Sequence, residues 1–273
     1  MTADSARDPL DEVALRKRVL GASSGWRRLD VVRETGSTNA DLIARANAGE
    51  DVAGAVLIAE HQTAGRGRQG RSWFDAPRAQ VAMSVGIDAS GVPTDRWGWL
   101  PLAAGVSIVE AVGRLGAVEV ALKWPNDVMA KGRKLAGILA EVAAPQPTIV
   151  VGIGLNVTLR NDEIAAPEAI SISELGVDGP SRYQVVAELL DVLSGHVREW
   201  RESFGADSRL AATYREMCST LGVPVRADLP GDRTVVGVAR DVDEQGRLRI
   251  DGEGEVVVLA AGDVVHLRPT AIG

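Results

Sequence analysis

The spacing of apolar and polar residues predicts alternating helices and strands over most of the chain. A helix follows Asp11 and ends at Gly21, and an amphipathic helix begins after Asn39 and stops at Gly49. Further helices are expected over 95–115, 181–204 and 210–217. Strands are expected over 29–33, 55–60, 80–87, 118–123, 135–142 and 148–157.

The pattern changes at Val223. The remaining sequence consists of short alternating segments joined by the turn sequences PGD, EQG and GEG, which are typical of antiparallel strands. We therefore predict three parts: a disordered polar terminus over 1–9, a large domain over 10–220, and a small antiparallel β-barrel over 221–270.

Composition narrows the possible functions. The net charge of −7 argues against general nucleic-acid binding, because phosphate backbones select basic surfaces. A single cysteine, Cys218, excludes an internal disulfide and favours a reducing cytoplasm. The first residues do not resemble a signal peptide, and the apolar run over 100–109 is too short to span a bilayer, so no membrane partner is expected.

The most informative segment is GRGRQGRSW at 65–73, the glycine–arginine loop. Arg66, Arg68 and Arg71 place three permanent positive charges among glycines, which suits a loop that folds over a small anionic ligand. The segment also fits the dinucleotide fingerprint G-x-G-x-x-G, but no strand directly precedes it and no helix opens within it. A solvated basic loop is the other alternative, and Trp73 at its end argues against that.

The segment KWPNDV at 123–128 places Asn126 and Asp127 after Pro125, which ends a strand. Side-chain oxygens at a strand end suit a hard cation, and the same residues are equally typical of a turn. Lys134 begins the next apolar segment, and a hairpin would bring it near Asn126 and Asp127. An ordinary surface lysine is the alternative.

Three further positions offer polar groups. The segment Ser37-Thr38-Asn39 precedes a helix, whose first backbone N–H groups can serve both a cap and a ligand. Gln62, between a buried strand and the glycine–arginine loop, offers an amide that both donates and accepts. Asn156 ends a strand and needs hydrogen-bond partners if it is buried.

Five motifs occur in a fixed order: GSTN, EHQTAGRGRQGRSW, KWPNDV, RKLAGILAE and VGIGLNV. Together they resemble the catalytic core of the biotin–protein ligases, over about residues 36–156. The resemblance implies an α/β (α+β) catalytic domain related to class II aminoacyl-tRNA synthetases and lipoate ligases, followed by an SH3-like C-terminal β-barrel. Some members carry an N-terminal DNA-binding domain, and the short segment before Gly36 implies the monofunctional type without it.

The resemblance also implies residue roles. The implied biotin contacts are Ser37, Thr38, Asn39, Gln62, Arg66, Gly67, Arg68, Lys134 and Gly152. The implied contacts to ATP and the adenylate are Arg68, Arg71, Trp73 (stacked on adenine), Asn126, Lys134 and Asn156. Lys134, Arg66 and Arg68 are the implied catalytic side chains, Asp127 is a candidate for orienting the attacking amine, and Mg²⁺ is expected near Asn126. Gln69 stands where many relatives carry a basic residue.

The implied reaction has two steps. Biotin and ATP form biotinyl-5′-AMP, and biotin then passes to a lysine of the biotin carboxyl carrier protein domain of an acyl-CoA carboxylase. This carrier is the expected partner of a cytoplasmic monomer or weak homodimer. The alternatives are a lipoate or octanoate ligase on the same scaffold, a non-catalytic biotin-responsive regulator, and a nucleotide-binding module without transfer activity.

Overall fold

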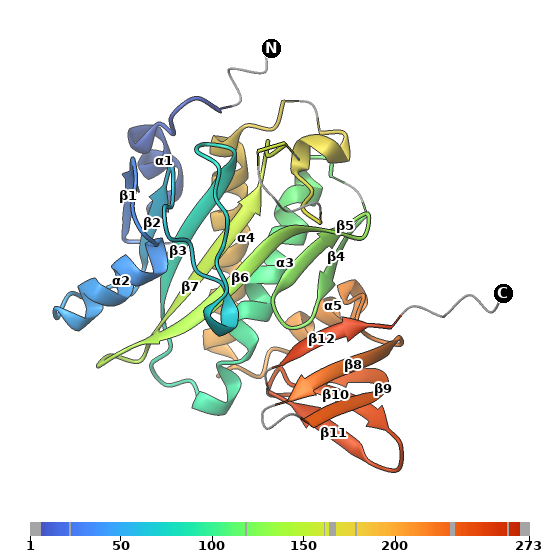
Figure 1. Ribbon diagram of the computed structural model, residues 1–273. Helices are drawn as coiled ribbons and strands as arrows, with labels where there is room; N and C mark the ends of the chain where they lie inside the picture. The colour runs from blue at the N-terminus through green and yellow to red at the C-terminus, as the bar shows by residue number, and fades with distance from the viewer. Residues whose placement is uncertain are drawn as a thin grey trace.

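A seven-stranded sheet forms the centre of the molecule (Figure 1). The computed structural model describes residues 7–21, 23–117, 119–160, 162–163, 168–177, 179–229, 233–260 and 262–267. The strands are β1 (Arg28–Val32), β2 (Ala55–Ala59), β3 (Gln80–Asp88), β4 (Val120–Lys123), β5 (Asp127–Ala130), β6 (Arg133–Ala143) and β7 (Thr148–Asn156). They lie in the order β1-β2-β3-β7-β6-β5-β4, with β1 and β2 parallel and the other neighbours antiparallel.

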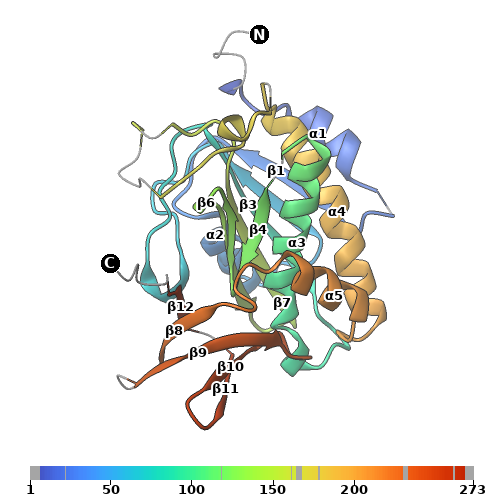
Figure 2. The ribbon, with the colours of Figure 1, turned by 90° about the vertical axis from the view of Figure 1, so that its right-hand side faces the viewer.

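Helices cover both faces of this sheet. They are α1 (Glu12–Val19), α2 (Thr38–Asn47), α3 (Trp99–Arg114), α4 (Arg182–Glu202) and α5 (Ser208–Met217). Figure 2 shows α3 and α4 along one face, with α2 on the other. The sequence of α3 is apolar nearly all round, and the helix is accordingly buried between the sheet and α4. The second face is left to α2 and to the segments around it.

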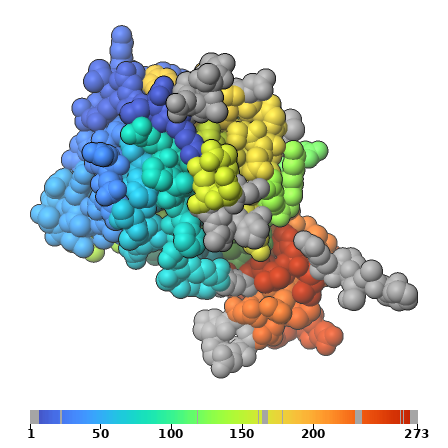
Figure 3. Space-filling model, turned by 45° about the horizontal axis from the view of Figure 1, so that its top comes forward, coloured from blue at the N-terminus to red at the C-terminus, as the bar shows by residue number. Residues whose placement is uncertain are grey.

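The C-terminal residues form a separate antiparallel sheet. Its strands β8 (Pro224–Leu229), β9 (Arg233–Val242), β10 (Leu248–Gly252), β11 (Val256–Leu259) and β12 (Asp263–His266) lie in the order β11-β10-β9-β8-β12. Figure 3 shows this lobe projecting from the main body. Hydrogen bonds join the lobes near Trp124, whose indole Nε1 donates to Gly246 O at 3.0 Å. The backbone N of Trp124 donates to Thr220 Oγ1 at 3.1 Å, and this hydroxyl lies 3.0 Å from His266 Nε2 in β12.

The predicted mixed α/β class and the small antiparallel C-terminal unit are confirmed. Details of the predicted elements need correction. The helix expected over 95–115 begins only at Trp99, because a 3₁₀ turn (η3, Thr94–Arg96) and Gly98 precede it. The short strand β5 had no predicted counterpart, because four residues are too few to reveal a period. Val118, the predicted start of β4, lies outside the described residues.

The predicted disorder over 1–9 does not extend to Arg7 and Asp8. Arg7 Nη1 lies 2.6 Å from Glu163 Oε1, and the backbone oxygen of Asp8 accepts a hydrogen bond from Arg182 Nη2 at 2.7 Å. Arg182 in turn forms a buried ion pair with Glu60 at 2.6 Å. Residues 7 and 8 are therefore attached to the main domain, and residues 1–6 lie outside the described residues.

Candidate active site

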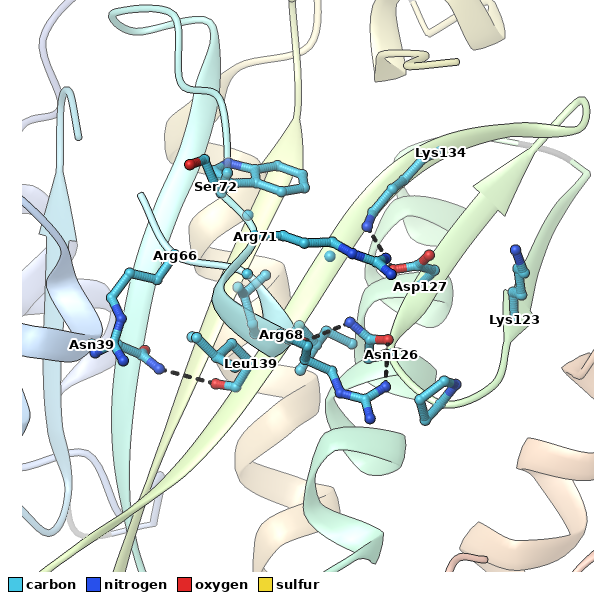
Figure 4. A pocket seen from close by; sticks show the side chains of 18 of the residues that line it. Asn39, Arg66, Arg68, Arg71, Ser72, Lys123, Asn126, Asp127, Lys134 and Leu139 are labelled. Carbon is cyan, nitrogen blue, oxygen red and sulfur yellow. Dashed lines mark hydrogen bonds and ion pairs between the residues drawn. The ribbon is translucent and has the colours of Figure 1, made fainter. Parts of the chain in front are cut away.

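A cavity of about 300 Å³ lies beneath the glycine–arginine loop, against β3, β7 and β6 and beside the C-terminal sheet. It collects the predicted site residues from segments that are far apart in sequence. Those that line it are Ser37, Thr38, Asn39, Gln62, Arg66, Gly67, Arg68, Arg71, Trp73, Asn126, Asp127, Lys134 and Gly152. Figure 4 shows the three arginines reaching different regions: Arg66 toward Asn39, Arg68 toward Asn126, and Arg71 toward Lys134 and Asp127.

One end of the cavity is a buried polar network at the start of α2. The side-chain oxygen of Gln62 accepts from the backbone N of Thr38 at 2.9 Å. The hydroxyl oxygens of Thr38 and Ser84 are 2.6 Å apart, and Ser84 donates to Asn39 Oδ1 at 2.6 Å. Ser37 is the N-cap by position, but its side chain makes no capping bond. This end therefore holds hydrogen-bonding groups among apolar strands and suits the polar head of a ligand.

The β-sheet leaves room for this network because it has glycine where α2 comes close. Gly152 on β7 lies opposite Ser84 on β3, and a Cβ at Gly152 would collide with the amide of Asn39. Gly152 thus makes space for Asn39 at the base of the cavity. Its predicted place along the ligand is compatible with this position, since it lines the same cavity.

The glycine–arginine loop is a compact hairpin. Gly67 N donates to Arg71 O at 2.7 Å, and Trp73 N donates to Gly65 O at 2.8 Å. The single 3₁₀ turn η2 (Arg68–Gly70) at its tip holds Gln69 at a φ of 55°. No longer helix opens there, so the dinucleotide-fingerprint alternative is wrong.

The base of this loop is held by Asp75, whose carboxylate accepts a hydrogen bond from the backbone N of Gln62. Burial of the Asp75 carboxyl group raises its pKa to about 6, against the opposing effects of that hydrogen bond and of the nearby charges of His61 and Arg182. Asp75, which follows the loop, is therefore connected to Gln62, and Gln62 in turn contacts Thr38.

Trp73 lies flat over two glycines. Gly137 on β6 and Gly154 on β7 are paired across the sheet, and a Cβ on either would collide with the indole. The ammonium nitrogen of Lys134 lies 5.6 Å from the centre of the indole ring, within the range of a cation–π interaction. The aromatic ring thus forms a wall of the cavity beside the cation.

The predicted hairpin brings Lys134 to Asp127, with Nζ 2.6 Å from Oδ1. Beside them, Arg68 Nη1 donates to Asn126 Oδ1 at 3.2 Å, and Asn126 Nδ2 donates to Ile138 O at 3.1 Å. Burial lowers the pKa of the Arg68 guanidinium from its usual value, although the charge of Asp127 opposes the shift. This end of the cavity is cationic and suits an anionic group.

Asn156 does not line the cavity. Its side chain is buried, where Oδ1 accepts from Gln80 Nε2 at 2.7 Å and Nδ2 donates to Ile170 O at 3.0 Å. These partners satisfy the amide and tie β7 to its surroundings. No group of three or more His, Cys, Asp or Glu residues that could hold a metal ion occurs in the described part of the chain.

Sequence reasoning missed several residues of the site. Glu141 and Ser84 join the polar network, and Lys123 and Asp228 line the cavity from the two lobes. The available signal for Ser84 was one hydroxyl in the otherwise apolar middle of a strand. Glu141 is in phase with Gly137 along β6, so alternation would have placed both on one face.

Two protein-family models match the chain. The Biotin/lipoate A/B protein ligase family matches residues 31–157, and the Biotin protein ligase C terminal domain matches residues 220–267. The fold and the cavity thus belong to the class of biotin or lipoate ligases. None of the helices in the described ranges is long and apolar enough to cross a membrane.

Individual relatives narrow this class. The biotin–[acetyl-CoA-carboxylase] ligase of Mycobacterium tuberculosis is 55% identical, over 97% of this chain and 98% of its own length. The bifunctional ligase/repressor BirA of Escherichia coli is 32% identical, over 91% of this chain and 76% of its own length. The structure of the Aquifex aeolicus biotin protein ligase in complex with biotin and ATP aligns with a TM-score of 0.76 at 25% identity, covering 89% of this chain and all of that one. The chain belongs to the biotin protein ligase family.

Proposed function

We propose that this protein activates biotin with ATP as biotinyl-5′-AMP and transfers it to a lysine of a biotin carboxyl carrier protein domain. The proposal rests on one observation, the distribution of polar and charged groups within the cavity. A neutral polar network around Thr38 and Gln62 occupies one end, and the cations Arg68 and Lys134 occupy the other. That polarity matches a ligand with a ureido head at one end and a carboxylate joined to phosphate at the other.

The first step joins two anions. The biotin carboxylate is ionised at neutral pH, so it needs no base to attack the α-phosphorus of ATP. The difficulty is electrostatic repulsion and alignment, which fixed cations reduce. Lys134 is held between Asp127 and Trp73, and this position suits a bridge between the biotin carboxylate and the α-phosphate. Pyrophosphate leaves as the carboxylate oxygen bonds to phosphorus.

The adenylate must then be protected from water until an amine arrives. The glycine–arginine loop covers the cavity, and Arg66 and Arg71 extend from it toward opposite sides. We expect Gly65–Ser72 of this loop to be mobile without ligand and ordered on the adenylate, with Trp73 stacked on adenine. In the second step the carrier lysine attacks the acyl carbon and AMP leaves. Asp127 is the candidate for orienting that amine, because its carboxylate is beside Lys134.

Mg²⁺ fits this site as the partner of ATP. Asn126 and Asp127 offer side-chain oxygens at the cationic end, and protein-bound Mg²⁺ typically takes one or two carboxylates together with substrate phosphates and water. When bound, the ion neutralises phosphate charge. We further propose a cytoplasmic reaction, a monomer or weak homodimer, and a domain boundary between residues 220 and 221.

The decisive experiment is transfer of labelled biotin to a purified carrier domain with ATP and Mg²⁺. Mass spectrometry should find one modified carrier lysine, and omission of ATP should abolish it. Excess lipoate should compete poorly, because its ring has no N–H groups for the polar network. Preferential transfer of lipoate would identify a lipoate ligase instead, and binding of both substrates without transfer would reduce the protein to a binding module.

A further inference from the structure

Glu141, near the end of β6, contacts two parts of the cavity that come from distant segments. Its Oε2 accepts a hydrogen bond from Asn39 Nδ2 at 2.9 Å, and its Oε1 lies 3.1 Å from Arg66 Nη2. Asn39 is in the first turn of α2, whereas Arg66 is in the glycine–arginine loop. One carboxylate therefore joins the base of the cavity to the loop that covers it.

We propose that Glu141 is a positioning residue for biotin, which fixes the amide of Asn39 and holds Arg66 over the ureido subsite. The inference rests on the proposed function and names a residue that acts through two others. Glu141 does not itself line the cavity, so its effect on a ligand has to pass through Asn39 and Arg66.

The orientation of the Asn39 amide follows from its neighbours. Its Nδ2 donates to the carboxylate of Glu141 and to Leu139 O at 3.1 Å, which are both acceptors only. The reversed amide would face two acceptors with its own oxygen. Glu141 thereby directs Asn39 Oδ1 toward Ser84, whose hydroxyl donates to it at 2.6 Å.

The orientation of the Asn39 amide determines the direction of the remaining hydrogen bonds in the network. Ser84 has one hydroxyl hydrogen, and because Asn39 accepts it, Ser84 accepts in its 2.6 Å contact with Thr38. The single hydroxyl hydrogen of Thr38 therefore points toward Ser84 Oγ and Gln62 Oε1, the second of which lies 3.1 Å away. Thr38 lines the cavity, and the lone pairs of its Oγ1 are then available to accept from a ligand N–H. A ureido ring offers such donors, whereas the dithiolane ring of lipoate offers none.

The second arm of Glu141 acts on the loop. The side chain of Arg66 is 50% exposed and that of Glu141 is 24% exposed, so their ion pair contributes little to folding stability. The ion pair matters because it fixes the position of Arg66, which would otherwise have many alternative conformations on a glycine-rich segment. Holding Arg66 beside Asn39 lowers the entropy lost when biotin binds.

The test is a double-mutant cycle between Glu141 and Arg66, read by calorimetric titration with biotin. E141Q keeps an acceptor oxygen but loses the charge, and we expect it to weaken biotin binding about tenfold in the otherwise unchanged protein. In the R66A background the same change should weaken binding less than twofold, because the glutamine oxygen still accepts from Asn39 and the arginine that the lost charge would hold is gone. V142A, on the exposed neighbouring position, is the matched control and should bind biotin like the wild type.

Thermal unfolding of each variant accompanies the cycle, and the midpoint of E141Q should stay close to that of the wild type. Equal effects of E141Q in both backgrounds would overturn the positioning role while leaving the proposed function intact. A wild-type protein that neither binds biotin nor supports biotin-dependent ATP–pyrophosphate exchange would overturn the proposed function and the inference together.

Discussion

Gly137 and Gly154 lie opposite each other on β6 and β7, and the indole of Trp73 covers both. The two missing side chains give the aromatic ring a flat surface and let it approach the backbone of the sheet. The same surface places the ring beside Lys134. Glycines that appear in the sequence as interruptions of apolar strands are therefore part of the site.

Replacement of Gly154 by alanine should displace Trp73. The added Cβ would collide with the indole. Because the glycine lies in a regular strand, the structural change should be confined to the surroundings of Trp73. We expect biotin-dependent ATP–pyrophosphate exchange to fall at least tenfold. The control is G113A in α3, where a Cβ meets nothing within 4 Å. Equal exchange rates for both variants would contradict the role of Gly137 and Gly154 in positioning Trp73.

Lys134→Ala should remove the cation between the two reacting anions. The side chain is partly exposed, at 35%, so the variant should fold with little loss of stability. Pyrophosphate exchange should fall by about a hundredfold or more, as expected for loss of a charged contact to a transition state. Lys131→Ala, in the exposed turn before β6, is the control and should retain the rate. A K134A enzyme with a near-normal rate would remove Lys134 from the mechanism.

Asp75→Asn should change how stability depends on pH. Burial raises the folded-state pKa of Asp75 to about 6, above the ordinary carboxyl value of 3.8. The stabilising contribution of the protonated carboxyl is thus fully present below pH 3.8 and is lost as the pH rises through 6. Asparagine has no carboxyl group to ionise but retains an acceptor oxygen for the Gln62 amide.

The free energy of unfolding, measured with urea, should therefore favour the D75N variant over the wild type more strongly at pH 7.5 than at pH 4.5. The difference between the two proteins should change mainly between pH 4 and 6. Parallel pH profiles for the two proteins would mean that burial does not oppose ionisation of this carboxyl group in solution.

Short motifs with unusual composition were enough to predict most of the cavity. Arg66, Arg68 and Lys134 stand out because charge and glycine alternate within a few residues, and the structure brings them to one cavity. The roles of Ser84 and Glu141 depend on strand register instead. Ser84 matters because it lies opposite Gly152, and no local pattern in either strand reveals that pairing.

Contacts between the lobes could not be predicted from the sequence either. Asp228 and Val264 line the cavity because the C-terminal sheet contacts the main domain near Trp124, and docking of two domains leaves no periodic signal. Asn156 illustrates the reverse case. Its position at a strand end predicted a need for partners if it is buried, and Gln80 and Ile170, which become neighbours only in the folded chain, supply them.

Thr220 connects the C-terminal sheet to the segment that carries Asn126. Its buried hydroxyl accepts from Trp124 N and lies 3.0 Å from His266 Nε2 in β12. Thr220→Val keeps the volume but leaves the backbone N–H of Trp124 without a partner, which should lower the free energy of unfolding by about 1–3 kcal/mol. The exchange rate should fall as well, because Trp124 begins the turn that positions Asn126.

Thr220→Ser separates the hydroxyl from the methyl group. Serine retains the acceptor for Trp124 and loses only packing, so its exchange rate should stay near that of the wild type even if some stability is lost. Urea unfolding and pyrophosphate exchange measured on both variants decide the matter. If T220V and T220S lose activity equally, the hydrogen bonds of the Thr220 hydroxyl do not hold the cavity, and the C-terminal sheet contributes through packing alone.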